Sequence, residues 1–182
     1  GVYTLVGVLD FASLYPTTMI IWNICYTTLL EKDEEWPIEE THLIEWVEHI
    51  GCEHDPQKRK KKKEDVLCGE HSYRFKKVRI IIEDDGSVRY ENEGLMPRLE
   101  KNLLGNRSRV KKEMFKCQAR LNMHLGKASD EDVAFYKKCG FEIIGKDSLS
   151  TEAESVLRMC IGVLDAKQLA IKISANSAYG GM

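Results

Sequence analysis

The first sixteen residues constrain the fold of this chain more than any other stretch. Residues 3–9 are mostly apolar and β-branched, which predicts a buried strand. The strand delivers Asp10 at its end, and the chain then turns toward Pro16, a residue that suits the first turn of a helix. A helix start exposes backbone N–H groups that attract phosphate. This order of features predicts a carboxylate that holds a metal ion beside a polyphosphate.

An isolated Asp followed three residues later by Ser more often only caps a helix. This stretch extends much further, because residues 10–17 read Asp-Phe-Ala-Ser-Leu-Tyr-Pro-Thr and residues 23–29 continue Asn-Ile-Cys-Tyr-Thr-Thr-Leu. Together these residues resemble the first catalytic palm motif of the family B (α/δ-like) DNA polymerases.

The resemblance implies a role for each residue of this motif. In the family, the Asp binds two catalytic Mg²⁺ ions and the carbonyl group of the next residue adds a ligand, which assigns Mg²⁺ to Asp10 and Phe11. Backbone amides of the turn hold the triphosphate of the incoming dNTP, and Phe11, Ser13 and Leu14 occupy those positions. Tyr15 corresponds to the residue that stacks under the sugar and excludes a 2′-hydroxyl group.

Composition sets few further limits. The 182 residues suffice for one domain or two small ones, and a net charge of −2 does not exclude a nucleic-acid enzyme, because only the surface that meets phosphate must be basic. No apolar run reaches the roughly 18 residues needed to span a bilayer, so we expect an intracellular protein without a membrane partner. The six cysteines lack the dense spacing of secreted scaffolds and fit reduced thiols.

Residues 38–50 predict a helix, since their apolar side chains recur three and four positions apart before Gly51. Two pairs follow, Cys52 with His54 and Cys68 with His71. Two Cys and two His are donors for a tetrahedral Zn²⁺ site. The spacing matches no strong zinc-finger pattern, so loop residues that only pack and hydrogen-bond are the alternative to zinc.

A basic run over residues 57–63, Gln-Lys-Arg-Lys-Lys-Lys-Lys, separates the two pairs. Its self-repulsion predicts a solvated loop, with contact to DNA phosphate or a nuclear-import signal as alternatives. Residues 73–82 then predict a strand, and a turn at 84–87 leads to a return strand over 88–90. This order resembles the segment that several large-DNA-virus polymerases carry between the first palm motif and the fingers, which implies a viral source of the nucleocytoplasmic type.

Residues 98–125 predict a long basic helix. An ordinary helix with a solvated basic face would have the same pattern. Residues 103–111, however, resemble the fingers pattern Leu-Leu-x-x-Arg-x-x-x-Lys of the family, which implies that Arg107 and Lys111 bind the β- and γ-phosphates. Gly105 and Asn106 are weak helix formers inside this motif, so we expect the helix to bend or to begin its regular part there.

The last third of the chain predicts more helix. Residues 130–138 form a short helical stretch in the return of a hairpin, and the periodic run from Thr151 predicts one helix, or two that meet near Gly162. Lys172, Asn176 and Tyr179 share one helix stripe, unless Tyr179 is only a buried aromatic residue beside a capping Asn. Their string resembles the second family motif, in which the Lys meets the triphosphate and the Asn and Tyr abut the incoming base pair.

These patterns predict an α+β fold, a partial palm with a strand, turn, helix and β-hairpin, followed by an α-helical hairpin that forms the fingers. We expect three regions. Residues 1–30 form a palm segment with the first motif, residues 31–93 form an insertion with the Cys/His pairs, basic loop and hairpin, and residues 94–182 form the fingers and end in the second motif.

The resemblance implies a DNA-directed DNA polymerase that uses two Mg²⁺ ions, dNTPs and primer–template DNA, with a processivity factor as a further partner. Its location would be the host nucleus or a cytoplasmic viral factory. Neither end of the sequence resembles a natural terminus, so we expect an excerpt that lacks the later Asp-Thr-Asp motif and is inactive alone. The alternatives are a catalytically inactive polymerase-like structural subunit and a zinc-dependent nucleic-acid-binding module.

Overall fold

The computed structural model describes residues 13–52, 54–57 and 67–180, so the strand predicted over residues 3–9 lies outside the described residues. Helices and strands are both present, which confirms the predicted α+β class. The chain divides into two compact units, Gly1–Leu99 and Glu100–Met182. In the part of the chain that is described, no helix has both the length and the apolar character to cross a membrane.

The elements are α1 (Leu14–Trp22), the 3₁₀ turn η1 (Ile38–Glu40), β1 (Thr41–Glu48), β2 (Gly69–Lys76), β3 (Arg79–Ile82), β4 (Val88–Glu91), α2 (Leu95–His124), α3 (Asp130–Lys138) and α4 (Thr151–Gly180).

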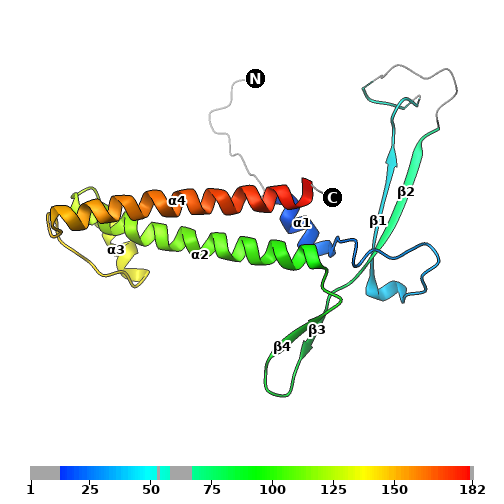
Figure 1. Ribbon diagram of the computed structural model, residues 1–182, viewed down its shortest axis with the longest axis horizontal. Coiled ribbons are helices and arrows are strands. Elements are labelled where there is room, and N and C mark those ends of the chain that lie inside the picture. The colour runs from blue at the N-terminus through cyan, green and yellow to red at the C-terminus, as the bar shows by residue number, and fades with distance from the viewer. Residues whose placement is uncertain (1–12, 53, 58–66, 181–182) are drawn as a thin grey trace. The chain divides into compact units, whose positions relative to one another are not determined.

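The longer ribbon of the first unit is built from β1 and β2, which pair antiparallel from Thr41 opposite Lys76 to Glu48 opposite Gly69 (Figure 1). The helix predicted over residues 38–50 is therefore wrong, because only the 3₁₀ turn η1 is helical there. Residues 41–48 are rich in β-branched and aromatic side chains, which favour a strand once a partner strand is available. Cross-strand stacking supports this pairing, since the ring centroids of Trp46 and His71 lie 4.9 Å apart.

A second, shorter hairpin joins β3 and β4, with Gly86 at φ 79° in its turn. This hairpin was predicted, but the single strand predicted over residues 73–82 is divided into β2 and β3. The division follows from hydrogen bonding at the end of β2. The N–H of Lys76 donates to the carbonyl of Thr28, and the N–H of Leu30 donates to the carbonyl of Arg74, so this end of β2 also pairs with residues 28–30.

Asn23, at the C-terminal end of α1, ties three segments of the first unit together. Its side chain is completely buried, and its amide nitrogen donates to the carbonyl oxygens of Lys76 and Asn92, each at 2.7 Å. Its Oδ1 accepts from the N–H of Gly94 at 2.8 Å. A Cβ at Gly94 would lie 2.8 Å from the Cβ of Cys25, so only glycine fits this close approach. The ends of α1 and β2 and the residue before α2 thus meet at one side chain.

The second unit is a helical hairpin made of α2 and α4 (Figure 1). Two contacts set the antiparallel alignment of the helices, because Arg107 hydrogen-bonds Gln168 and His124 lies 3.4 Å from Glu154. The α2 helix begins at Leu95, so the expectation that its regular part starts only at Gly105 is wrong. A glycine costs about 1 kcal/mol relative to alanine inside a helix, which packing along a helix of 30 residues readily offsets.

At the far end of the hairpin, α3 packs on the C-terminal half of α2. The predicted boundaries of this helix are confirmed, and its start is fixed by Ser129 and Asp132, whose side chains and backbone N–H groups bond reciprocally. Tyr136 of α3 is buried against Ala119 and Met123 of α2. The Phe115 ring adds an edge contact, with its centroid 5.8 Å from that of Tyr136.

Glu100 of α2 is completely buried, and neither of its carboxylate oxygens has a hydrogen-bond partner among the described residues. Burial raises the pKa of this carboxyl group. A buried carboxylate without a partner destabilises the folded state in its ionised form.

We expect Asn23→Ala to lower the free energy of unfolding by about 2–4 kcal/mol, because it breaks three hydrogen bonds and leaves buried backbone groups without partners. Urea unfolding followed by tryptophan fluorescence measures this loss. Thr18→Ala, which removes a solvent-exposed hydrogen bond from the same helix, is the matched control and should change stability by less than about 0.5 kcal/mol. Equal effects of the two substitutions would contradict the role given to Asn23.

Glu100→Gln should stabilise the chain at neutral pH and change how its stability depends on pH. Because the folded state raises the pKa of Glu100, the folded state binds the proton more tightly, and this stabilisation is lost as pH rises through the folded pKa. Urea unfolding in a series from below the ordinary pKa of 4.5 to neutral pH should show a decline that the variant lacks. Glu131→Gln, at an exposed helix position, should change stability by less than about 0.5 kcal/mol. Parallel curves for wild type and Glu100→Gln would refute the prediction.

Candidate functional site

The start of α1 carries the part of the first motif that the structure describes. Ser13 precedes the helix with φ 59° and ψ 57°, a left-handed conformation that costs about 1–2 kcal/mol for a residue with a side chain. Its carbonyl accepts the first helical hydrogen bond, from the N–H of Thr17 at 3.0 Å. Such strain persists only where the surrounding structure holds it, and it is typical of functional turns.

The helix begins with two exposed side chains, Leu14 and Tyr15, and the buried Pro16 lies in its first turn as predicted. The first N–H groups of any α-helix lack acceptors within the helix, so this end of α1 offers backbone donors and a partial positive charge. Asp10 and Phe11, the predicted metal ligands, lie outside the described residues.

The second unit carries the cationic residues of the fingers motifs. Arg107 is half-buried, and its Nε donates to Oε1 of Gln168 on the facing helix at 3.3 Å. The amide nitrogen of Gln168 donates in turn to Oδ1 of Asp165 at 3.1 Å. Sequence reasoning missed Gln168, because no spacing within one helix indicates a contact between two helices. This contact restrains the guanidinium group of Arg107.

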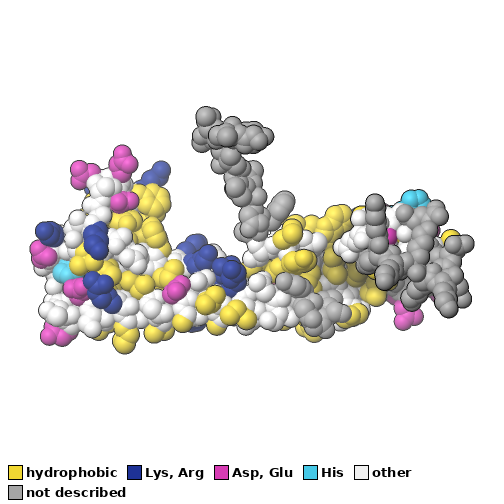
Figure 2. Space-filling view, turned by 90° about the horizontal axis from the view of Figure 1, so that it is seen from above, with side chains coloured by type: hydrophobic (Ala, Val, Ile, Leu, Met, Phe, Trp, Pro, Cys, Tyr) yellow, Lys and Arg dark blue, Asp and Glu magenta, His cyan; other side chains and the backbone are white. Residues whose placement is uncertain are grey.

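Lys111 and Lys172 are exposed on either side of the Arg107–Gln168 contact. Because α2 and α4 run antiparallel, Lys111 lies one turn from Arg107 in one direction and Lys172 lies one turn from Gln168 in the other. With about 5.4 Å per turn, the three cations spread over roughly 11 Å along the hairpin. Figure 2 shows Lys and Arg side chains gathered partway along the helical hairpin. Three positive charges in a row suit a polyphosphate.

The end of α4 carries the remaining motif residues. The helix is continuous from Thr151 to Gly180, so the spacing of Lys172, Asn176 and Tyr179 places them on one face, as predicted. Asn176 is exposed, whereas its neighbour Ala175 is buried. The Tyr179 side chain lies outside the described side chains.

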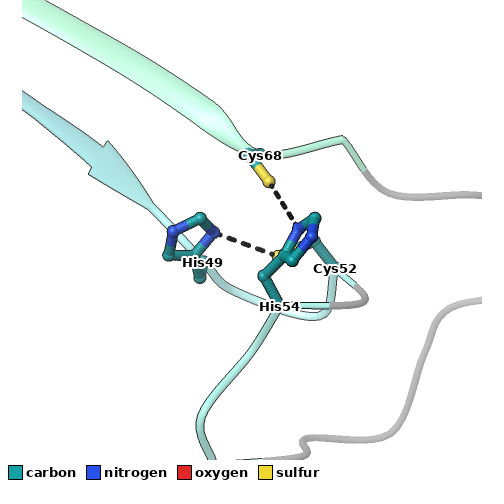
Figure 3. Close-up of side chains that lie close together, drawn as sticks. All are labelled: His49, Cys52, His54 and Cys68. Carbon is teal, nitrogen blue, oxygen red and sulfur yellow. Dashed lines mark hydrogen bonds between the residues drawn. The ribbon is translucent and has the colours of Figure 1, made fainter.

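A cluster of Cys and His side chains lies at the end of the β1–β2 ribbon (Figure 3). One donor atom from each residue lies within 4.8 Å of all the others. Nδ1 of His49 lies 3.6 Å from Sγ of Cys52, and Nδ1 of His54 lies 3.4 Å from Sγ of Cys68. The members are His49, Cys52, His54 and Cys68.

Three of these residues belong to the predicted zinc set, but the fourth is His49 and the prediction of His71 is corrected. His71 lies opposite Trp46 within the ribbon and stacks on its ring, with Nε2 3.6 Å from a carboxylate oxygen of Glu48. Sequence reasoning missed His49, because it placed this residue inside a helix predicted over residues 38–50 and not at the end of a strand. The spacing His-x-x-Cys from His49 to Cys52 was the available signal.

Local structure holds the cluster in place. The buried Asp55 accepts hydrogen bonds from the N–H of Gly51 at 2.8 Å and from the N–H of Gln57 at 2.9 Å, which closes the turn that presents Cys52 and His54. Burial, reinforced by the neighbouring sulfur of Cys52, raises the pKa of the Cys68 thiol. Two crowded sulfurs of this kind gain from a bound cation, which stabilises their thiolate forms.

Comparison with known proteins places these residues in a family context. The sequence model of "DNA polymerase family B" matches residues 1–128. "DNA polymerase 120R" of Invertebrate iridescent virus 3 is 31% identical over 209 residues, covering 99% of this chain and 15% of the relative. The "DNA polymerase" of Red sea bream iridovirus is 30% identical over 211 residues (100% and 18%), and the "DNA polymerase delta catalytic subunit" of Mesocricetus auratus is 28% identical over 175 residues (96% and 10%). The chain therefore spans only a small part of these relatives, and no solved structure matches it.

Proposed function

Because this chain belongs to family B of the DNA polymerases, we propose that the protein containing it performs template-directed DNA synthesis. The reaction transfers a nucleotidyl group from a dNTP to the 3′-hydroxyl group of a primer on template DNA. The observation that carries the proposal is the family match over residues 1–128, and relatives named DNA polymerase align with nearly the whole chain. The iridovirus relatives support replication of viral DNA as its role.

Asp10 and the carbonyl group of Phe11 are assigned to the catalytic metal ions. Carboxylate and carbonyl oxygens are the hard ligands that Mg²⁺ prefers. Held by these two groups, the ions would supply activation of the primer hydroxyl group and stabilisation of the leaving pyrophosphate. In the sequence Asp10 precedes α1, whose start has Ser13 in a left-handed conformation and favours negative charge, and this supports the assignment.

The remaining motif residues are assigned to the nucleotide. Arg107, Lys111 and Lys172 bind the triphosphate, whose charge must be neutralised while the reacting groups are held in line. The contact with Gln168 supports this assignment for Arg107, because a restrained guanidinium group loses less entropy on binding. The backbone amide of Leu14 is assigned to the triphosphate. Tyr15 is assigned to the sugar, where its ring excludes a 2′-hydroxyl group. Asn176 and Tyr179, the other residues of the second motif, are assigned to the incoming base pair.

Asp10→Ala in the complete protein tests the proposed function. We expect wild type to extend a primer on a template and the variant to lose extension, because a metal-binding carboxylate is missing. Asp130→Ala, at an exposed position in α3, is the control and should retain activity. Extension by Asp10→Ala would refute the metal assignment. A wild-type protein that binds primer–template DNA without extending it would favour the alternative, an inactive polymerase-like subunit.

Removing a fingers cation should weaken use of the nucleotide. A charged hydrogen bond contributes about 1.5–3 kcal/mol, so Arg107→Ala and Lys111→Ala should each lower kcat/KM for dNTP by about tenfold to a hundredfold. Steady-state primer extension at varied dNTP concentration measures this loss.

Two further variants sharpen the fingers experiment. Lys112→Ala removes an exposed charge that points about 100° away from Lys111 around the helix, so kcat/KM should stay within about twofold of wild type if the effect is specific to the motif. Gln168→Ala leaves Arg107 charged but removes its restraint, and its loss should be smaller than that of Arg107→Ala. Equal losses in Lys111→Ala and Lys112→Ala would indicate a general charge effect and contradict the assignment.

A further inference from the structure

The β1–β2 ladder brings two segments that are far apart in sequence to one place. Glu48 ends β1 and pairs with Gly69, which begins β2. His49 and Cys68 are the next residues beyond this pair, so the ladder itself positions them at the end of the ribbon (Figure 3). Cys52 and His54 join them from the turn that Asp55 closes. The cluster therefore has a structural cause and is not a chance approach of surface side chains.

The separations of the donor atoms suit one tetrahedral ion. With bonds of about 2.3 Å from zinc to sulfur and 2.0–2.1 Å from zinc to nitrogen, neighbouring ligand atoms around Zn²⁺ lie roughly 3.3–3.8 Å apart. The two sulfur-to-nitrogen distances of 3.6 and 3.4 Å fall within this range. All four donor atoms already lie within 4.8 Å of one another, so rotations of the side chains bring them onto a common ion.

We propose that His49, Cys52, His54 and Cys68 bind one Zn²⁺ ion with four protein ligands. Two thiolates and two imidazoles form the donor set of structural zinc sites, and among the described residues no carboxylate belongs to the cluster. This site differs in chemistry from the oxygen-rich Mg²⁺ site proposed for catalysis. All six cysteines of the chain are free thiols, so Cys52 and Cys68 are available as ligands.

The ion stabilises the end of a ribbon that has little other support. An isolated two-stranded hairpin is marginal in water. Within the described residues, the sheet has two strands, and the additional pairing with residues 28–30 lies at the opposite end of the ribbon from the cluster. The basic run over residues 57–63 lies between His54 and Cys68 in the sequence. Zinc thus joins the two segments that flank this run, and its binding energy becomes folding energy of the ribbon.

Metal analysis of the complete protein, purified under reducing conditions with zinc present, tests the site. Wild type should contain one more equivalent of zinc than His49→Ala and than Cys52→Ser. His71→Ala is the matched control, because this histidine lies within the ribbon outside the cluster, and it should retain all the zinc of wild type. Equal zinc in wild type and Cys52→Ser would overturn the proposal. Loss in His71→Ala with retention in His49→Ala would overturn the ligand set.

Two readouts separate loss of a ligand from loss of the fold. After exchange of zinc for Co²⁺, wild type and His71→Ala should show the thiolate charge-transfer band and the d–d bands of tetrahedral cobalt, whereas Cys52→Ser should show a weaker thiolate band. Chelation of zinc should speed hydrogen exchange at the amides of Val47–Glu48 and Gly69–Glu70 and leave α3 unchanged. Absence of the thiolate band in wild type, or a Cys52–Cys68 disulfide in its place, would overturn the proposal. None of these measurements depends on polymerase activity.

Discussion

The hydrogen bonds of the buried Asn23 side chain hold the first unit together. One amide group satisfies two backbone carbonyls and one backbone N–H in segments 53 to 71 residues away along the chain. Buried polar backbone groups must find partners, and here a single side chain replaces the secondary structure that would otherwise supply them. The end of α1, the end of β2 and the entry to α2 are fixed together as a result. A strained turn such as Ser13 can persist beside a helix whose other end is held this firmly.

The helices were predictable from the sequence because their signals are local. Pro16 in the first turn, Ser129 before an acidic turn and the long periodic runs of α2 and α4 each act within a few residues. The helix predicted over residues 38–50 was wrong because its apolar residues also fit a strand, and the deciding partner, β2, begins about twenty residues further along the chain. The bonds of Asn23 could not be predicted either, since no local pattern indicates acceptors so distant in sequence.

In the candidate sites too, features that depend on local spacing were predictable, and features that depend on contacts between distant segments were not. Motif spacing identified Arg107, Lys111, Lys172 and Asn176, and the continuous helices place them as expected, although their roles remain predictions. Composition identified a Cys/His cluster but not its fourth member, because the choice between His49 and His71 depends on strand register. In the observed register His71 stacks within the ribbon and His49 lies at its end. The restraint of Arg107 by Gln168 likewise requires the packing of two helices, which the sequence does not reveal.

The two proposed metal sites differ in whether the protein ligands leave coordination positions of the metal ion free, and this difference decides their roles. A catalytic site needs coordination positions for substrate oxygens, which a carboxylate and a carbonyl group leave free. Four protein ligands around Zn²⁺ fill a tetrahedron completely and leave no position for a substrate. The proposed zinc site is therefore a structural one, and its removal should act through the ribbon alone. Thiolates are soft ligands that suit Zn²⁺ and not Mg²⁺, whereas carboxylate and carbonyl oxygens are the hard ligands that suit Mg²⁺, so the two donor sets differ in the ion that they suit.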